Sequence, residues 1–163
     1  MARTSSALPL GLLFAGLVVY ASLYPFDGWR VQGVAPLAFL FAPLPQYWTG
    51  FDVLSNLVGY APLGFLLAVA LLRAGLHLRA AVWATLACAA LSLSVETLQN
   101  FLPARVPSNV DWALNTAGGA LGAALANVFQ RLGWLDAWSR FRADWFAPHA
   151  QGGLVLLALW PFA

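Results

Sequence analysis

Charge is scarce in this sequence. Only 9% of its 163 residues are charged and 61% are hydrophobic, whereas a soluble domain has about 25% charged residues. Lysine is absent, so all eight basic side chains are arginines, and the net charge is +2. So few cations cannot form the basic surface that nucleic acid requires. The composition therefore predicts a membrane protein in contact with lipid and argues against a nucleic-acid partner.

Cysteine and histidine are also nearly absent. The single cysteine, Cys88, lies in an apolar run, so no disulfide and no cysteine-based metal site can form within one chain. We interpret Cys88 as a small packing residue. The two histidines, His77 and His149, lie in segments predicted to be cytoplasmic, on the other side of the membrane from the main group of polar residues. The sequence thus offers no Ser-His-Asp triad, and we predict no cofactor and assign no metal site.

Long apolar runs dominate what remains. Four of them can cross a hydrocarbon layer of about 30 Å as helices, and they cover residues 7–23, 51–72, 80–102 and 111–132. The first could instead be a signal peptide, but a retained helix is favoured. Only Arg3 precedes it, and residues 20–24 offer a weak cleavage pattern. We predict an all-α fold, a polytopic bundle of transmembrane helices with four spans.

Two shorter regions differ from these runs. Residues 31–50 are rich in proline and aromatic residues and are expected at the membrane interface. Residues 133–147 repeat Trp134, Trp138 and Phe141 at helical spacing with charges on the other face, which predicts an amphipathic interfacial helix. Three parts result: a four-span domain at 1–132, an amphipathic interfacial linker at 133–150, and at 151–163 the start of a fifth span that is cut short.

The arginines predict how the spans are oriented. With four spans, six arginines fall on the side of the N-terminus, and Arg30 and Arg105 fall on the other side. Cytoplasmic loops carry the excess of positive charge, so the N-terminus is predicted to be cytoplasmic. This topology brings the ends of three spans together near the outer surface. The polar residues found there are Asp52, Asn56, Glu96, Gln99, Arg105, Asp111 and Asn115.

These seven residues are the predicted ligand-binding set, and the sequence leaves three interpretations of them open. They can form a polar plug that fixes helix packing, with Arg105 paired to Glu96 or Asp111. They can form a pocket in which Arg105 binds an anionic group and Asp52, Glu96 or Asp111 acts as acid or base. The three carboxylates can also hold a divalent cation. A continuous pore is disfavoured, because the cytoplasmic halves of the spans carry almost no polar residue.

Small residues in the last of the four runs predict close helix packing. Gly118 and Gly122 are separated by three residues, a spacing that lets another helix approach to backbone distance. We therefore expect helix packing through Gly118 and Gly122.

The spacing of the polar residues resembles the VanZ-like family of bacterial membrane proteins over residues 51–128. The matching residues are Asp52, Asn56, Pro62, Gly64 and Phe65, then Glu96 and Gln99, then Arg105, Ser108, Asp111, Asn115 and Gly118. The resemblance implies a small multi-spanning protein of the bacterial inner membrane, linked to resistance to the glycopeptide antibiotic teicoplanin. Many members carry His where this chain has Asn56, so a role of that His as a base cannot transfer here.

The resemblance and the predicted location together suggest two functions. In the first, the outward-facing acidic pocket binds or modifies a cell-envelope component, an anionic lipid-linked or peptidoglycan-related ligand. In the second, the protein is a non-catalytic membrane scaffold or assembly subunit, and the polar cluster only fixes helix packing. Whether the protein is an enzyme is left open at this point.

Overall fold

The computed structural model describes residues 5–45, 47–77 and 79–145. The predicted fifth span and the end of the linker lie outside the described residues. Within this part of the chain, five α-helices and one short 3₁₀ helix form and no strand does, which confirms the all-α prediction. The elements are α1 (Ala7–Leu23), η1 (Ala38–Phe41), α2 (Gly50–Arg73), α3 (Ala80–Gln99), α4 (Asn109–Arg131) and α5 (Trp134–Trp145).

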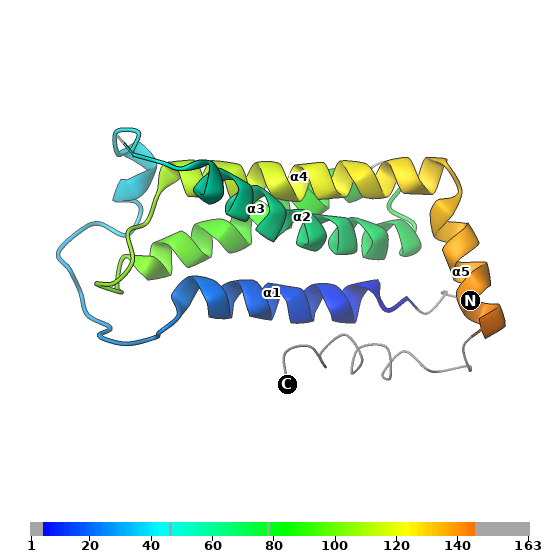
Figure 1. Ribbon diagram of the computed structural model, residues 1–163, viewed down its shortest axis with the longest axis horizontal. Coiled ribbons are helices and arrows are strands. Elements are labelled where there is room, and N and C mark those ends of the chain that lie inside the picture. Colours follow the sequence, from blue (N-terminus) through cyan, green and yellow to red (C-terminus); the bar gives the residue numbers. More distant parts are fainter. Residues whose placement is uncertain (1–4, 46, 78, 146–163) are drawn as a thin grey trace.

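Helices α1 to α4 run side by side along the long axis of the molecule, and successive helices point in opposite directions (Figure 1). The end of α1, the start of α2, the end of α3 and the start of α4 therefore meet at one end of the bundle, which we call the polar end. Helix α5 crosses the opposite end. The sequence-distant polar residues are thus brought to a common end.

Two helices, α2 and α3, are long and apolar enough to cross a membrane, and α1 is a shorter apolar helix of 17 residues. Helix α4 has 23 residues, but it contains Asp111, Asn115 and several glycines. It is therefore not counted with α2 and α3 as clearly apolar enough to cross a membrane. Together with the composition, α2 and α3 indicate a membrane protein.

Side-chain caps fix where α2 and α4 begin. The Thr49 hydroxyl accepts a hydrogen bond from the backbone N–H of Asp52 at 3.2 Å, and the Asp52 carboxylate accepts one from the Thr49 N–H at 2.8 Å. This reciprocal capping box satisfies two backbone donors that a helix N-terminus leaves open. Ser108 caps α4 in the same way through the N–H of Asp111, at 3.3 Å.

Helix α3 ends at Gln99, three residues before the end of the apolar run. The chain turns there, because the N–H of Leu102 donates to the carbonyl of Gln99 at 2.9 Å, and Pro103 follows, which cannot continue a helix. The turn buries Leu102 against Leu23 and Val95. The prediction from hydrophobicity alone therefore placed the end of this span three residues too late.

The interface between α2 and α4 is the most extensive in the bundle. A Cβ atom added to Gly118 would overlap the backbone of Leu57, and one added to Gly122 would overlap the carbonyl of Ala61. Gly64 lies in the same way against the backbone of Gly119. The two helix backbones are therefore in direct contact along this line of glycines, which we call the glycine seam.

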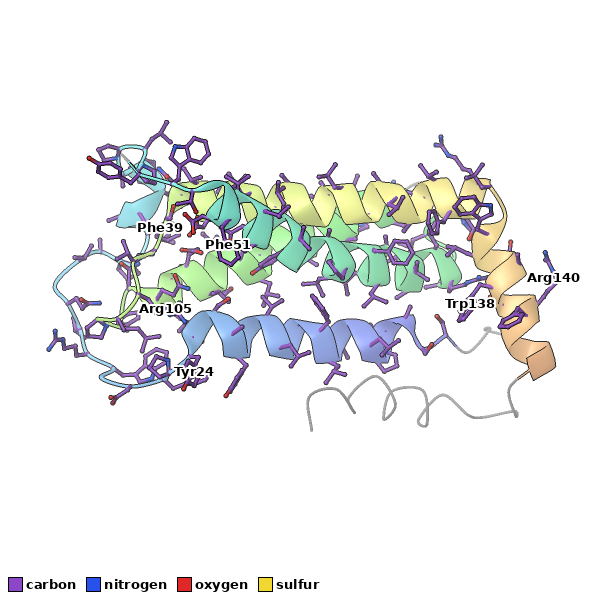
Figure 2. All side chains as sticks on the ribbon, in the orientation of Figure 1. Tyr24, Phe39, Phe51, Arg105, Trp138 and Arg140 are labelled. Carbon is purple, nitrogen blue, oxygen red and sulfur yellow. The ribbon has the colours of Figure 1, made fainter. Side chains whose placement is uncertain are left out.

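Helix α5 is tied to the bundle by one arginine. The guanidinium of Arg73 donates to the Asp136 carboxylate at 2.8 Å, the Leu135 carbonyl at 2.7 Å and the Ser139 hydroxyl at 2.8 Å. Trp138 projects back along the bundle and Arg140 projects away from it (Figure 2). These two residues thus lie on different sides of α5, as an amphipathic helix requires.

Candidate functional site

The loop between α1 and α2 and the turn between α3 and α4 are fastened to each other at the polar end. Four long-range hydrogen bonds make this connection: Arg30 N–H to Phe101 O at 2.9 Å, Gln32 Nε2 to Asn100 O at 2.8 Å, Asn100 Nδ2 to Pro36 O at 2.6 Å, and Asn109 Nδ2 to Ala42 O at 2.8 Å. Each has a backbone carbonyl as acceptor. These bonds therefore hold loop backbone in place.

Arg105 and Gln99 bind the C-terminal end of α1. Arg105 donates to the Tyr24 carbonyl at 2.6 and 3.1 Å and to the Ala21 carbonyl at 3.2 Å, and Figure 2 shows it near Tyr24. Gln99 donates to the Ser22 carbonyl at 3.1 Å. The last carbonyls of a helix lack intrahelical donors, and a cation is favoured there by the helix dipole. Arg105 thus contacts α1 carbonyls in place of the expected Glu96 or Asp111.

Asp52 lies at the edge of this end. Its side chain is exposed, and both the N–H and the hydroxyl of Thr49 donate to its carboxylate at 2.8 Å. Asp52, Gln99 and Arg105 therefore form a rim in which each side chain bonds to backbone near a helix end. We call these three residues the rim.

Three helices bring a second group of polar side chains together below the rim. Each helix contributes two residues that are four positions apart and hence on one face. The pairs are Asn56 and Tyr60 on α2, Ser92 and Glu96 on α3, and Asp111 and Asn115 on α4. We call these six residues the three-helix cluster. Ser92, Glu96, Tyr60 and Asn115 are at most 5% exposed, so water does not freely solvate them.

Hydrogen bonds link the three helices within the cluster. Asn56 Nδ2 donates to Asp111 Oδ1 at 3.1 Å, and Asn115 Nδ2 donates to Ser92 Oγ at 3.0 Å. Glu96 Oε2 accepts from the backbone N–H of Ser108 at 2.8 Å. Because Ser108 also caps α4, the Glu96 carboxylate is held against the start of that helix.

Two buried polar atoms of the cluster have no hydrogen-bond partner in the described part of the chain, the Tyr60 hydroxyl and Asn115 Oδ1. The Tyr60 hydroxyl lies close to the Ser92 hydroxyl and in electrostatic range of Glu96, but the two hydroxyls do not reach the geometry of an ordinary hydrogen bond. Buried polar groups are nearly always bonded, and leaving one unbonded costs about 1–3 kcal/mol. These two atoms are thus available to a bound group.

The three-helix cluster contains two carboxyl groups and neither arginine nor histidine. Glu96 and Asp111 lie close enough to interact electrostatically, and neither forms an ion pair with any described Arg or His. Among the described residues, no group of three or more His, Cys, Asp or Glu side chains is arranged to hold a metal ion. The arrangement can accept hydrogen bonds from a ligand and exchange protons with it through a carboxylic acid.

The structure divides the seven predicted residues into two groups. Asn56, Glu96, Asp111 and Asn115 belong to the three-helix cluster, whereas Asp52, Gln99 and Arg105 belong to the rim. Sequence reasoning missed Tyr60 and Ser92 as site residues. Their signal was the four-residue spacing, since Tyr60 follows Asn56 and Ser92 precedes Glu96 by one helical turn.

Comparison with known proteins places the chain in a family. The sequence pattern of the VanZ/LLP1 family matches residues 7–130, which span α1 to α4 almost completely and include both the rim and the three-helix cluster. No curated protein and no solved structure matches the chain. The match extends the motif resemblance to most of the chain and confirms it. The protein therefore belongs to the VanZ/LLP1 family.

Proposed function

We propose that the protein is a multi-pass protein of the bacterial inner membrane, in which α1 to α4 are four spans and the N-terminus is cytoplasmic. The polar end then faces outward, and α5 lies in the cytoplasmic surface of the membrane. The apolar helices α2 and α3, the family and the six arginines on the N-terminal side support this topology. The opposite directions of Trp138 and Arg140 support the interfacial placement of α5.

We propose that the protein binds or modifies a cell-envelope component at the polar end. The proposed link to glycopeptide resistance of the teicoplanin type rests on the family resemblance. The observation that carries this proposal is the three-helix cluster with its two unpartnered atoms. A polar network that served packing alone would be expected to satisfy its buried groups, because a partly satisfied network is less stable than an apolar core.

The ligand class that we propose is an anionic lipid-linked or peptidoglycan-related molecule. Arg105 is partly buried, and within the described residues its Nη1 makes no hydrogen bond. This nitrogen can donate to a phosphate or carboxylate at the rim. Glu96 or Asp111 would transfer protons to or from the ligand. Asp52 suits this role less well, because Thr49 occupies its carboxylate.

The test combines binding with a cellular measurement. The protein in phosphatidylcholine nanodiscs is titrated with undecaprenyl phosphate, and teicoplanin susceptibility is measured in a bacterial host that expresses it. We expect Arg105→Gln to weaken binding about tenfold, the value of one charge-assisted hydrogen bond. Glu96→Gln and Asp111→Asn remove the proposed acid or base, so they should remove any change in susceptibility while the phosphate still binds. Asp27→Asn, at an exposed position in the loop after α1, is the matched control and should behave as wild type.

A scaffold or assembly role is the second candidate, and the contacts of the rim favour it. Gln99, Asn100, Arg105 and Asn109 all bond to backbone carbonyls of other segments, so much of the polar end serves folding. If Arg105→Gln, Glu96→Gln and Asp111→Asn lower the melting temperature without a selective change in binding or susceptibility, the scaffold role replaces the pocket.

A further inference from the structure

The three-helix cluster is rich in hydrogen-bond acceptors. One N–H of the Asn115 amide is used by Ser92, and one N–H of the Asn56 amide is used by Asp111. A carboxylate and an amide oxygen can only accept hydrogen bonds, and a tyrosine hydroxyl can accept one. The second N–H of each amide and the two hydroxyls can still donate, but Asn115 Oδ1 and the carboxylates can be satisfied only by a group that donates hydrogen bonds.

The two carboxyl groups of the cluster favour a cationic hydrogen-bond donor over a neutral one. Glu96 is 3% exposed and Asp111 is half-buried beside it, and within the described chain no cation pairs with either. A buried charge is stable only when it is paired or well bonded. Arg105 does not meet this need, because its hydrogen bonds go to α1. A cationic donor would pair with these carboxyl groups in their ionised form, whereas a neutral donor would supply no compensating charge.

We propose that Tyr60, Glu96 and Asn115 form a subsite for a primary ammonium group. An ammonium has three N–H donors, and the subsite offers three acceptors from three helices: the Tyr60 hydroxyl, the Glu96 carboxylate and Asn115 Oδ1. A quaternary ammonium has no N–H to donate. The proposal rests on the function proposed above, and it names the part of the ligand that would lie deepest in the site. The anionic part of the same ligand would remain at the rim, near Arg105.

A gradient of acidic residues leads from the surface to this subsite. Asp52 is exposed, Asp111 is half-buried, and Glu96 is buried. Asp52 and Asp111 interact electrostatically, and so do Asp111 and Glu96. A cation that approaches from the polar end therefore meets a carboxyl group at each depth.

The test uses simple amphiphiles that differ only in the head group. Protein in a neutral detergent is titrated with octylammonium, octyltrimethylammonium or octanol, and binding is followed by calorimetry and by the shift in melting temperature. We expect octylammonium to bind about tenfold or more tightly than the other two, since one charge-assisted hydrogen bond supplies that factor. Equal affinity for octylammonium and octyltrimethylammonium would overturn the proposal.

Tyr60→Phe is the decisive variant, because it removes an unpartnered hydroxyl and keeps the ring. The melting temperature without amphiphile should stay the same or rise, since an unbonded buried polar atom is lost, while the affinity for octylammonium falls about tenfold. Tyr20→Phe changes an exposed tyrosine on α1 and is the matched control. A tyrosine that only supported the fold would show the reverse, a lower melting temperature with octylammonium affinity unchanged, and this would contradict the proposal.

Two further titrations identify the source of the ammonium. Phosphatidylethanolamine is introduced into phosphatidylcholine nanodiscs, and free ethanolamine is added to a parallel sample. Saturable binding of the lipid assigns the subsite to a lipid head group, whereas binding of free ethanolamine at similar concentration assigns it to a soluble amine. Binding of neither would count against the subsite.

The proposed function and this inference fail in different ways. If undecaprenyl phosphate binds and octylammonium shows no preference, the ammonium subsite is wrong and the pocket remains. If octylammonium binds selectively while undecaprenyl phosphate does not bind and teicoplanin susceptibility is unchanged, the subsite remains and the proposed function is wrong.

Discussion

The interface between α2 and α4 changes its nature between two neighbouring residues of α2. At Asn56, the helices meet through side chains, and the Asn56 amide donates to the Asp111 carboxylate. At Leu57, they meet through backbone, with Gly118 directly against it. The three-helix cluster and the glycine seam are thus parts of a single interface. The comparison suggests that the seam fixes the helix positions, whereas the cluster, beside it, can keep polar atoms unbonded.

The largest effect is expected from breaking the seam. Gly122→Ala places a methyl group on the Ala61 carbonyl, so the backbones must separate, and we expect a loss of about 3 kcal/mol, the upper range for overpacking. The melting temperature in detergent and the yield of folded protein measure it. Gly16→Ala is the control: no atom lies within 4 Å of its Cβ position, and helix propensity predicts a small gain. Equal behaviour of both variants would mean that the seam does not set stability.

A smaller effect is expected in the cluster. Asn56→Ala removes the donor that the Asp111 carboxylate accepts at 3.1 Å, and a hydrogen bond to a charged group is worth about 2 kcal/mol. Asn56→His supplies a ring N–H at the same position and should recover most of the loss. Denaturant unfolding of the three proteins gives the comparison. A His variant as unstable as the Ala variant would show that the bond does not determine stability here.

The smallest effect is expected at the rim. Thr49→Ala removes half of the capping box of α2, and loss of such a cap lowers stability by about 1 kcal/mol. Ligand binding should be unchanged, because Thr49 contacts the rim and not the three-helix cluster. Thermal unfolding and octylammonium titration are measured on the same sample. If Thr49→Ala changes the affinity for octylammonium but not the melting temperature, the binding site includes the rim.

The fold was largely predictable because hydrophobic runs are local signals. The first run matches α1 at both ends. The end of α3 was predicted too late, since the turn after Gln99 is formed by apolar residues that hydropathy cannot distinguish from a helix. The number of spans stays a prediction, because two helices satisfy length and composition clearly.

The site was predictable only in part. Four of the predicted residues share the three-helix cluster because helix periodicity places them on common faces. Arg105 could not be placed in this way, because it lies in a turn, and its partners on α1 are more than 80 positions away. Tyr60 and Ser92 share helix faces with Asn56 and Glu96. The sequence does not say which way each helix face points in the bundle, so only the structure shows that these faces meet.

One consequence of the packing concerns how a ligand could reach buried acids. Helices α2 and α4 touch through backbone, but α3 meets the seam through a side chain, since a Cβ at Gly119 would press on the Cβ and sulfur of Cys88. Side chains can rotate, whereas backbones in contact cannot yield without separating the helices. We expect α2 and α4 to keep their positions when a ligand binds. Helix α3, which carries Glu96 and Ser92, is the helix that we expect to move.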